Sequence, residues 1–130
     1  MKKMFVFALP LLLVIALGIA GCGESSSGNG GSYTTPDVTM NQDGFDHDSL
    51  TVSAGTTVKF IDPSGASMHI LCVGENSNCD ASASGPAELT SGHTMQVMPG
   101  ETKQVTFDTP GSYKIACTLH PMMNMTITVQ

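Results

Sequence analysis

The chain has 130 residues, enough for one domain after a leader segment, and 41% of them are hydrophobic. It carries five lysines, no arginine and eleven acidic residues, for a formal net charge of −6. Binding to a nucleic-acid backbone needs clustered basic side chains, so this composition argues against a nucleic-acid partner. An acidic surface instead suits a basic protein partner, or serves solubility alone.

Residues 1–21 are predicted to be an export signal. Lys2 and Lys3 give a positive start, and an apolar run from Met4 to Ala20 follows. The run leads through Ile-Ala-Gly into Cys22, a sequence that resembles the lipobox of bacterial lipoproteins. That resemblance implies a lipid on Cys22 and removal of residues 1–21. The alternative is an uncleaved anchor helix, because the run has about the shortest length that spans a bilayer. Both readings tether the rest of the chain outside the membrane.

Residues 22–32 are predicted to form a flexible linker. Apart from Cys22 and Glu24, this segment contains only glycine, serine and asparagine, a composition that cannot bury enough apolar surface to fold. Removal of the leader would leave three lysines against eleven carboxylates, a formal charge of −8. The folded domain is then expected to cover residues 33–130.

Residues 33–130 contain short β-rich stretches separated by turn residues, without a sustained helical period. This pattern predicts an all-β sandwich of about seven or eight strands. The predicted strands cover residues 38–41, 49–52, 57–61, 68–73, 94–98, 102–108, 111–117 and 125–129. Alternating residues should fill the space between two sheets, namely Leu50, Val52, Val58, Phe60, Val105, Phe107, Tyr113, Ile115, Ile127 and Val129.

The segment between residues 73 and 92 is an insertion rich in serine and alanine, where a short helix can form. With Cys22 assigned to the lipid, three cysteines remain in an oxidising compartment. Cys72 and Cys79 are close in sequence and separated by turn residues, so a disulfide is predicted between them. Cys117 is then the unpaired thiol. A bridge from Cys117 to Cys72 or Cys79 is the alternative.

The loop that follows residues 111–117 carries a thiol, an imidazole and thioethers close together. Cys117 and His120 are three residues apart, and Met125 follows five residues later. His69, in a different predicted strand, can supply a second imidazole. A soft thiolate, neutral imidazoles and a weak thioether suit a copper ion that alternates between Cu(I) and Cu(II). Two histidines and one cysteine in a plane, with a long axial methionine, describe a blue-copper electron-transfer site.

The remaining histidines and several other methionines are weaker candidates for metal ligands. His47 lies between two aspartates and His93 follows Ser-Gly, contexts typical of surface residues. Gap filling in a small core explains the scattered methionines, which are Met40, Met68, Met95 and Met98. The sequence contains no Ser-His-Asp, zinc-protease or phosphate-loop motif, so we expect a carrier that is not an enzyme.

The segments that contain the candidate copper ligands, together with the strands around them, resemble the cupredoxins, especially plastocyanin and pseudoazurin. Residues 49–60, 98–103 and 107–120, together with His69, carry the resemblance, which extends over residues 33–130. It implies a Greek-key β-sandwich with one type 1 copper ion, held by His69, Cys117, His120 and Met125.

Two departures from plastocyanin leave parts of the site open. Met123 fits the shorter ligand loop of amicyanin, so it is the alternative axial ligand; Met125 is preferred because it begins the last predicted strand. Ile70 stands where plastocyanin has an asparagine that ties the two ligand segments together. The hydrogen bonds around the ligands therefore do not follow from the resemblance.

The expected function is the transfer of single electrons between a redox donor and an acceptor outside the cytoplasm, at the cell surface or in the periplasm. The resemblance implies that electrons leave through His120, where Leu119, Pro121, Met122 and Met123 would form an apolar collar for a partner with a basic docking surface. The alternative for at least one of the two methionines is core packing beneath the loop. We expect a monomer held at the membrane by its lipid. The alternative function is a copper-binding or chaperone lipoprotein that handles Cu(I).

Overall fold

The structure is a computed structural model that describes residues 35–63, 65–90 and 92–130. The predicted leader 1–21 and the linker 22–32, with its lipidated Cys22, lie outside these residues and stay predictions. The described residues form nine strands and one short 3-10 helix, η1 (Ala87–Leu89). In this part of the chain, no helix has the length and apolar character needed to span a bilayer.

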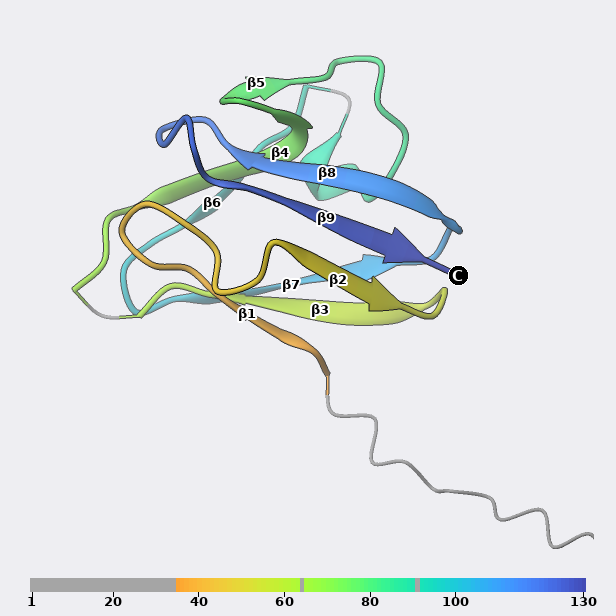
Figure 1. Cartoon of the computed structure of the whole chain (residues 1–130), viewed down its shortest axis with the longest axis horizontal. Helices are drawn as coiled ribbons and strands as arrows, with labels where there is room; N and C mark the ends of the chain where they lie inside the picture. The colour runs from red at the N-terminus through yellow and green to blue at the C-terminus, as the bar shows by residue number, and fades with distance from the viewer. Residues whose placement is uncertain (1–34, 64, 91) are drawn as a thin grey trace, which may run out of the picture. The chain divides into compact units, whose positions relative to one another are not determined.

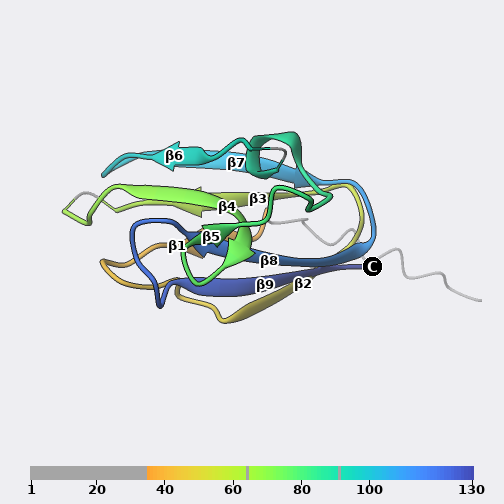
Figure 2. The same cartoon turned by 90° about the horizontal axis from the view of Figure 1, so that it is seen from above.

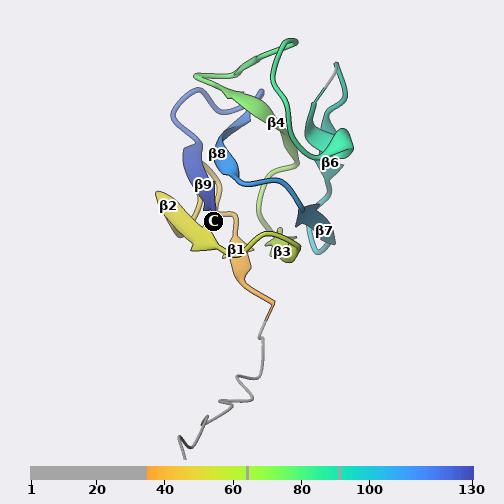
Figure 3. The same cartoon turned by 90° about the vertical axis from the view of Figure 1, so that its right-hand side faces the viewer.

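The strands form two sheets (Figures 1 and 2). The three-stranded sheet has the order β1 (Asp37–Thr39), β3 (Thr56–Ile61) and β7 (Thr102–Phe107). The six-stranded sheet has the order β2 (Ser49–Val52), β9 (Asn124–Val129), β8 (Gly111–Cys117), β4 (His69–Glu75) and β5 (Asn78–Cys79), and β6 (Met95–Val97) also pairs with β4. Figure 3 looks along the strands, with β2, β9 and β8 on one side of the domain and β3 and β7 on the other. The predicted all-β sandwich is confirmed.

The core lies between the sheets and is made by the predicted alternation. In β9, Met125, Ile127 and Val129 are buried while the residues between them are partly exposed. Nine of the ten predicted core residues are buried, and Leu50 is partly buried against the same cluster. Phe107 and Tyr113 pack with ring centroids 5.4 Å apart. Period-two burial of this kind fixes the register of each strand, because a shift of one residue would expose the whole apolar face.

The largest departure from the predicted strands is a hairpin at the start of the insertion. β4 extends to Glu75 and turns through Asn76 and Ser77 into β5, which was not predicted. Asn76 and Ser77 both have positive φ angles, 53° and 63°, and two such residues make the tight hairpin turn that matches strand twist. Asn-Ser lacks the glycine that usually marks this turn, so the hairpin is only weakly indicated by its turn residues.

The predicted disulfide is present and closes this hairpin. Cys72 in β4 is bonded to Cys79 in β5. Cys117 is the free cysteine among the described residues, and it is buried. Further along the insertion, η1 corresponds to the short helix that the sequence analysis allowed for.

Candidate metal centre

Sheet topology brings the predicted ligands to one end of the six-stranded sheet. His69 is the first residue of β4 and Cys117 is the last residue of β8. These strands are antiparallel neighbours with Leu71 opposite Cys117, so the start of β4 lies beside the end of β8. His120 follows in the loop from β8 to β9, which is drawn in blue at the same end of the domain (Figure 1).

The three donor side chains converge on a common point. The Cys117 Sγ lies 3.8 Å from Nδ1 of His69 and 3.4 Å from Nδ1 of His120. The ring centroids of the two histidines are 5.0 Å apart. Cys117 and His69 are fully buried, whereas His120 is partly exposed. Within the described residues, this is the one group of three or more His, Cys, Asp or Glu side chains placed to hold a metal, with donor atoms within 4.8 Å of one another.

The donor set fits copper in both geometry and chemistry. In Cys- and His-ligated zinc sites, metal–nitrogen and metal–sulfur bonds are about 2.0–2.3 Å, and bonds of this length around one ion give donor separations of the size seen here. One thiolate with two imidazoles is the soft donor set that copper electron-transfer sites use. The placement of His69, Cys117 and His120 therefore agrees with their predicted role.

Both candidate axial methionines are buried, Met123 directly before β9 and Met125 at the second position of this strand. Met123 and Met125 are 0% and 3% exposed. Met125 is paired with Ile115, and the Cys117 amide donates to the Met123 carbonyl at 3.1 Å, so Met123 is directly opposite Cys117. Directly opposed side chains in an antiparallel pair are closer than diagonal ones. The register therefore favours Met123, the alternative of the sequence analysis, over Met125.

Backbone hydrogen bonds hold the ligand loop against the sheet. The Thr118 amide donates to the Ile70 carbonyl at 2.8 Å, which joins the residue after Cys117 to the residue after His69. The Met123 amide donates to the His120 carbonyl at 2.9 Å and closes the turn. The two ligand segments are thus tied through main-chain atoms, so no side-chain amide is needed at position 70.

The β4–β5 hairpin contacts the same loop from outside the sheet through side-chain hydrogen bonds. The Ser77 hydroxyl donates to the Cys117 carbonyl at 3.0 Å. The Asn76 amide donates to Oδ1 of Asn124 at 2.8 Å, and Nδ2 of Asn124 donates to the Pro121 carbonyl at 3.2 Å. The insertion therefore contacts the proposed metal loop directly.

Asp62, a residue not singled out from the sequence, lies behind His69. Its Oδ2 is 4.0 Å from Nε2 of His69, and both side chains are fully buried. Burial raises the pKa of Asp62, and the nearby His69 opposes this shift. Burial also lowers the pKa of His69. The nearby Asp62 opposes this shift, and His120 adds to it. A lowered pKa keeps His69 neutral, which is the form that binds a metal.

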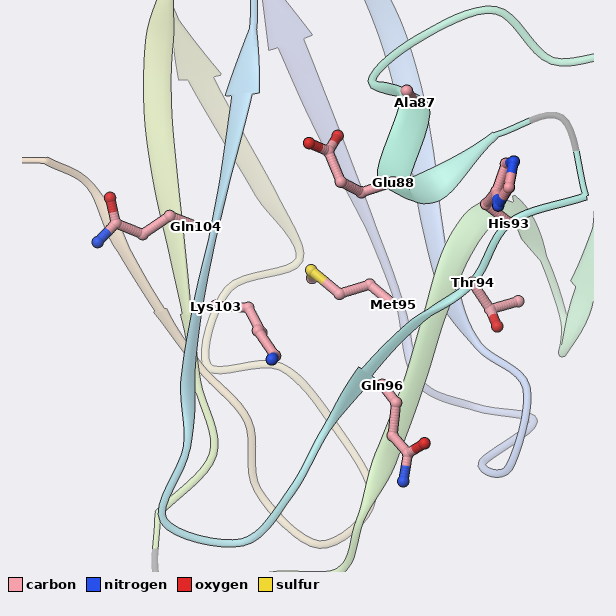
Figure 4. A pocket seen from close by; sticks show the side chains of 8 residues that line it. All are labelled: Ala87, Glu88, His93, Thr94, Met95, Gln96, Lys103 and Gln104. Carbon is pink, nitrogen blue, oxygen red and sulfur yellow. The ribbon is translucent and has the colours of Figure 1, made fainter.

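The other two histidines are exposed and lie apart from this group. His47 has its Nε2 3.6 Å from a carboxylate oxygen of Asp46. His93 lines an open surface pocket made by residues of η1, β6, β7 and the loop before β6 (Figure 4). That pocket contains none of the predicted ligands. It therefore gives no support to a second metal site.

Comparison with known proteins agrees with the fold and the donor set. Residues 34–130 match the model of a family described as copper binding proteins, plastocyanin/azurin family. The chain belongs to this cupredoxin family. Copper binding and electron transfer are thus shared with its family, while the pseudoazurin-like subtype stays a prediction. No curated protein sequence matches the chain significantly.

Solved structures of amicyanin share the cupredoxin fold of this chain. Amicyanin from Paracoccus versutus (Thiobacillus versutus) is 17% identical, with a TM-score of 0.55, over 75% of this chain and 83% of that one. An oxidized amicyanin mutant is 19% identical, with a TM-score of 0.56, over 74% and 82% of the two chains. A reduced Cu(I) form of another amicyanin mutant at pH 4 is 19% identical, with a TM-score of 0.55, over 75% of this chain and 83% of that one. At this identity the similarity establishes the fold alone, and it confirms the predicted cupredoxin-like sandwich.

Proposed function

We propose that this cupredoxin carries single electrons between redox partners outside the cytoplasm, using one type 1 copper ion. The observation that carries the proposal is the convergence of one buried thiol and two imidazoles within 4.8 Å. His69, Cys117 and His120 would hold the ion. The axial ligand is assigned to Met123 because it lies opposite Cys117, with Met125 as the competing assignment.

When bound, copper supplies the one-electron chemistry by alternating between Cu(II) and Cu(I). Cys117 offers the thiolate, and its full burial keeps bulk water from the sulfur. His69 belongs to β4, the strand that pairs with β8. The hydrogen bond between Thr118 and Ile70 fixes the distance of His69 from the ligand loop. Donor atoms fixed by the sheet need little rearrangement between the two oxidation states, and this favours fast transfer.

His120 is the proposed exit for electrons, because it is the one ligand of the three that is partly exposed. Its neighbours Leu119 and Met122 are 47% and 86% exposed, and Pro121 between them is exposed as well. Small apolar patches of this kind suit brief docking, where a weak interface allows fast release. The acidic character of the chain favours a partner with a basic docking surface.

The proposed location follows from the leader and from Cys22. An exported chain with a lipid on Cys22 would be held at the outer side of the membrane, with residues 22–32 as a tether. We propose a monomer in this position. Mass spectrometry of the protein purified from membranes would give a mature chain that begins at lipidated Cys22. A chain that still carries residues 1–21 would contradict the predicted cleavage.

The metal assignment is tested by absorption spectroscopy of the copper-loaded protein. We expect a strong visible band from thiolate-to-Cu(II) charge transfer, and we expect Cys117→Ser to abolish it. Circular dichroism of the copper-free variant should remain that of a β-sandwich, which separates loss of a ligand from loss of the fold. A visible band that survives in Cys117→Ser would refute the ligand set.

A second function, the handling of Cu(I) for delivery, is favoured by one observation. The sulfurs of Met68 and Met98 lie 2.9 and 3.1 Å from the same Gln96 amide nitrogen, and Met98 is 46% exposed. Exposed thioethers are soft ligands for Cu(I). Colourless copper that exchanges readily with a Cu(I) chelator would support delivery, whereas a stable visible band would support electron transfer.

A further inference from the structure

We infer that Asp62 is a positioning residue for His69 and that, through this imidazole, it sets the copper affinity and reduction potential of the centre. The inference rests on the proposed function, because it concerns the ligand role of His69. It goes further by naming a carboxylate that no comparison assigns and that the sequence alone did not mark.

The position of Asp62 is fixed by its backbone. It directly follows β3 in the three-stranded sheet, so it reaches His69 from the opposite sheet. Its amide donates to the Glu101 carbonyl at 2.9 Å, and its carbonyl accepts from the Gly100 amide at 2.8 Å. With both main-chain groups bonded to the turn before β7, the side chain is held in the interior.

The Asp62 carboxylate and Nε2 of His69 have no hydrogen-bond partner among the described residues. Both oxygens of Asp62 and Nε2 of His69 are buried. Asp62 is also the one buried carboxylate in this part of the chain. Buried polar groups are costly unless they are paired, so these two groups are each other's available partner. The 4.0 Å between them exceeds a hydrogen bond by about 1 Å.

The two ring nitrogens of His69 face different groups, and this determines what Asp62 can do. Nδ1 faces the Cys117 sulfur, while Nε2 faces Asp62. A carboxylate beside Nε2 stabilises the proton on that nitrogen and leaves the lone pair of Nδ1 for the metal. Carboxylates that accept from the far nitrogen of a ligand histidine orient the ring and raise its basicity.

The sign of the effect on the potential follows from charge. A buried negative charge near the site stabilises Cu(II) more than Cu(I), because Cu(II) carries the larger charge. The wild-type protein should therefore bind Cu(II) more tightly, and have a lower reduction potential, than a protein with a neutral group at this position. His120 and Cys117, the other titratable groups close to His69, both lie on the ligand side and cannot replace Asp62 at Nε2.

The test compares Asp62→Asn with Asp108→Asn, which removes one carboxylate charge at an exposed site. Outer partners of ligand histidines typically contribute about 10–100-fold in metal affinity, and we expect a Cu(II) loss of this size in Asp62→Asn. If Cu(I) affinity is unchanged, each tenfold loss raises the potential by about 59 mV. Asp108→Asn should resemble the wild type. Equal potentials and affinities in the two variants would overturn the inference.

A copper-free measurement separates this inference from the proposed function. Nitrogen-15 NMR of the wild-type apo protein should show His69 protonated at Nε2, and Asp62→Asn should change the tautomer populations. A wild-type His69 protonated at Nδ1 would overturn the role of Asp62, and this result does not depend on whether Asp62→Asn folds. If the wild type shows the Nε2 tautomer but no visible band with copper, the electron-carrier proposal fails while the Asp62–His69 pairing is supported.

Discussion

At the residue scale, two buried methionines compete for the axial position of one proposed metal ion. Both side chains are buried, and the choice between them depends on strand register. Met123, directly before β9, lies opposite Cys117, and Met125, in β9, lies opposite Ile115. Because directly opposed residues are close together, we propose Met123 as the axial ligand.

Leucine replacements distinguish the two methionines. Met123→Leu should remove the axial thioether and change both the visible band pattern and the Cu(II) paramagnetic resonance spectrum. Met125→Leu is the matched control and should leave both spectra close to those of the wild type. Leucine and methionine have similar volumes, and such exchanges cost less than about 1.5 kcal/mol, so both variants should fold. The reverse pattern would make Met125 the axial ligand.

The residues that could be predicted from the sequence are those with unusual chemistry. Cys117 and His120 were marked by their spacing, and His69 by the need for a second imidazole. Asp62 gave no such signal, because Asp-Pro-Ser-Gly after a strand has the composition of an ordinary turn. Its burial depends on how the two sheets pack, which periodicity within single strands does not report.

At the scale of elements, the β4–β5 hairpin acts as a support for the ligand loop. It is closed by the Cys72–Cys79 disulfide, and its turn residues Asn76 and Ser77 contact the loop through hydrogen bonds. The strands around the core were predicted because apolar residues alternate in them. The hairpin was missed because its strand β5 has two exposed residues and buries no apolar face.

Removing the Ser77 hydroxyl tests this support. In Ser77→Ala the Cys117 carbonyl loses a donor, and we expect the free energy of unfolding of the copper-free protein to fall by about 1 kcal/mol. Urea unfolding provides the measurement. The control is Ser112→Ala, an exposed serine in β8, where the expected change is within about 0.5 kcal/mol. Equal stability of the two variants would mean that the Ser77 bond contributes nothing.

The disulfide is expected to stabilise the fold without taking part in metal binding. For a loop of this length, the chain-entropy model gives a loss of about 2.5 kcal/mol when the bridge is removed. The double variant Cys72→Ala/Cys79→Ala should therefore unfold at lower urea and still show the visible copper band. Loss of the band in a folded double variant would contradict the assignment of Cys117 as the sulfur ligand.

At the scale of the whole molecule, charge and exposure are the basis of the proposed docking with redox partners. The chain has eleven acidic residues and five lysines, and the exposed apolar side chains of Leu119 and Met122 adjoin His120. An apolar contact area on an acidic chain combines weak docking with long-range attraction of a basic partner. The sequence predicted an apolar collar that included Met123, and the structure corrects this, because the Met123 side chain is fully buried.

Electron transfer to a basic redox protein should slow as salt increases. Salt screens the attraction between opposite charges on the two proteins. The Debye length, over which this attraction acts, shortens from about 10 Å at 0.1 M salt to about 3 Å at 1 M. Stopped-flow rates over this range give the measurement, with the copper absorption spectrum as a control for an intact centre. A rate that is constant or rises with salt would contradict electrostatic attraction.

X-ray absorption at the copper edge is the decisive experiment for the proposed centre, because it identifies the atoms bound to the metal. In the loaded wild-type protein we expect one short copper–sulfur bond and two copper–nitrogen bonds. In Cys117→Ser we expect the short sulfur bond to be lost. A copper ion surrounded by nitrogen and oxygen alone, or by thioether sulfurs without a short thiolate bond, would contradict the proposed centre.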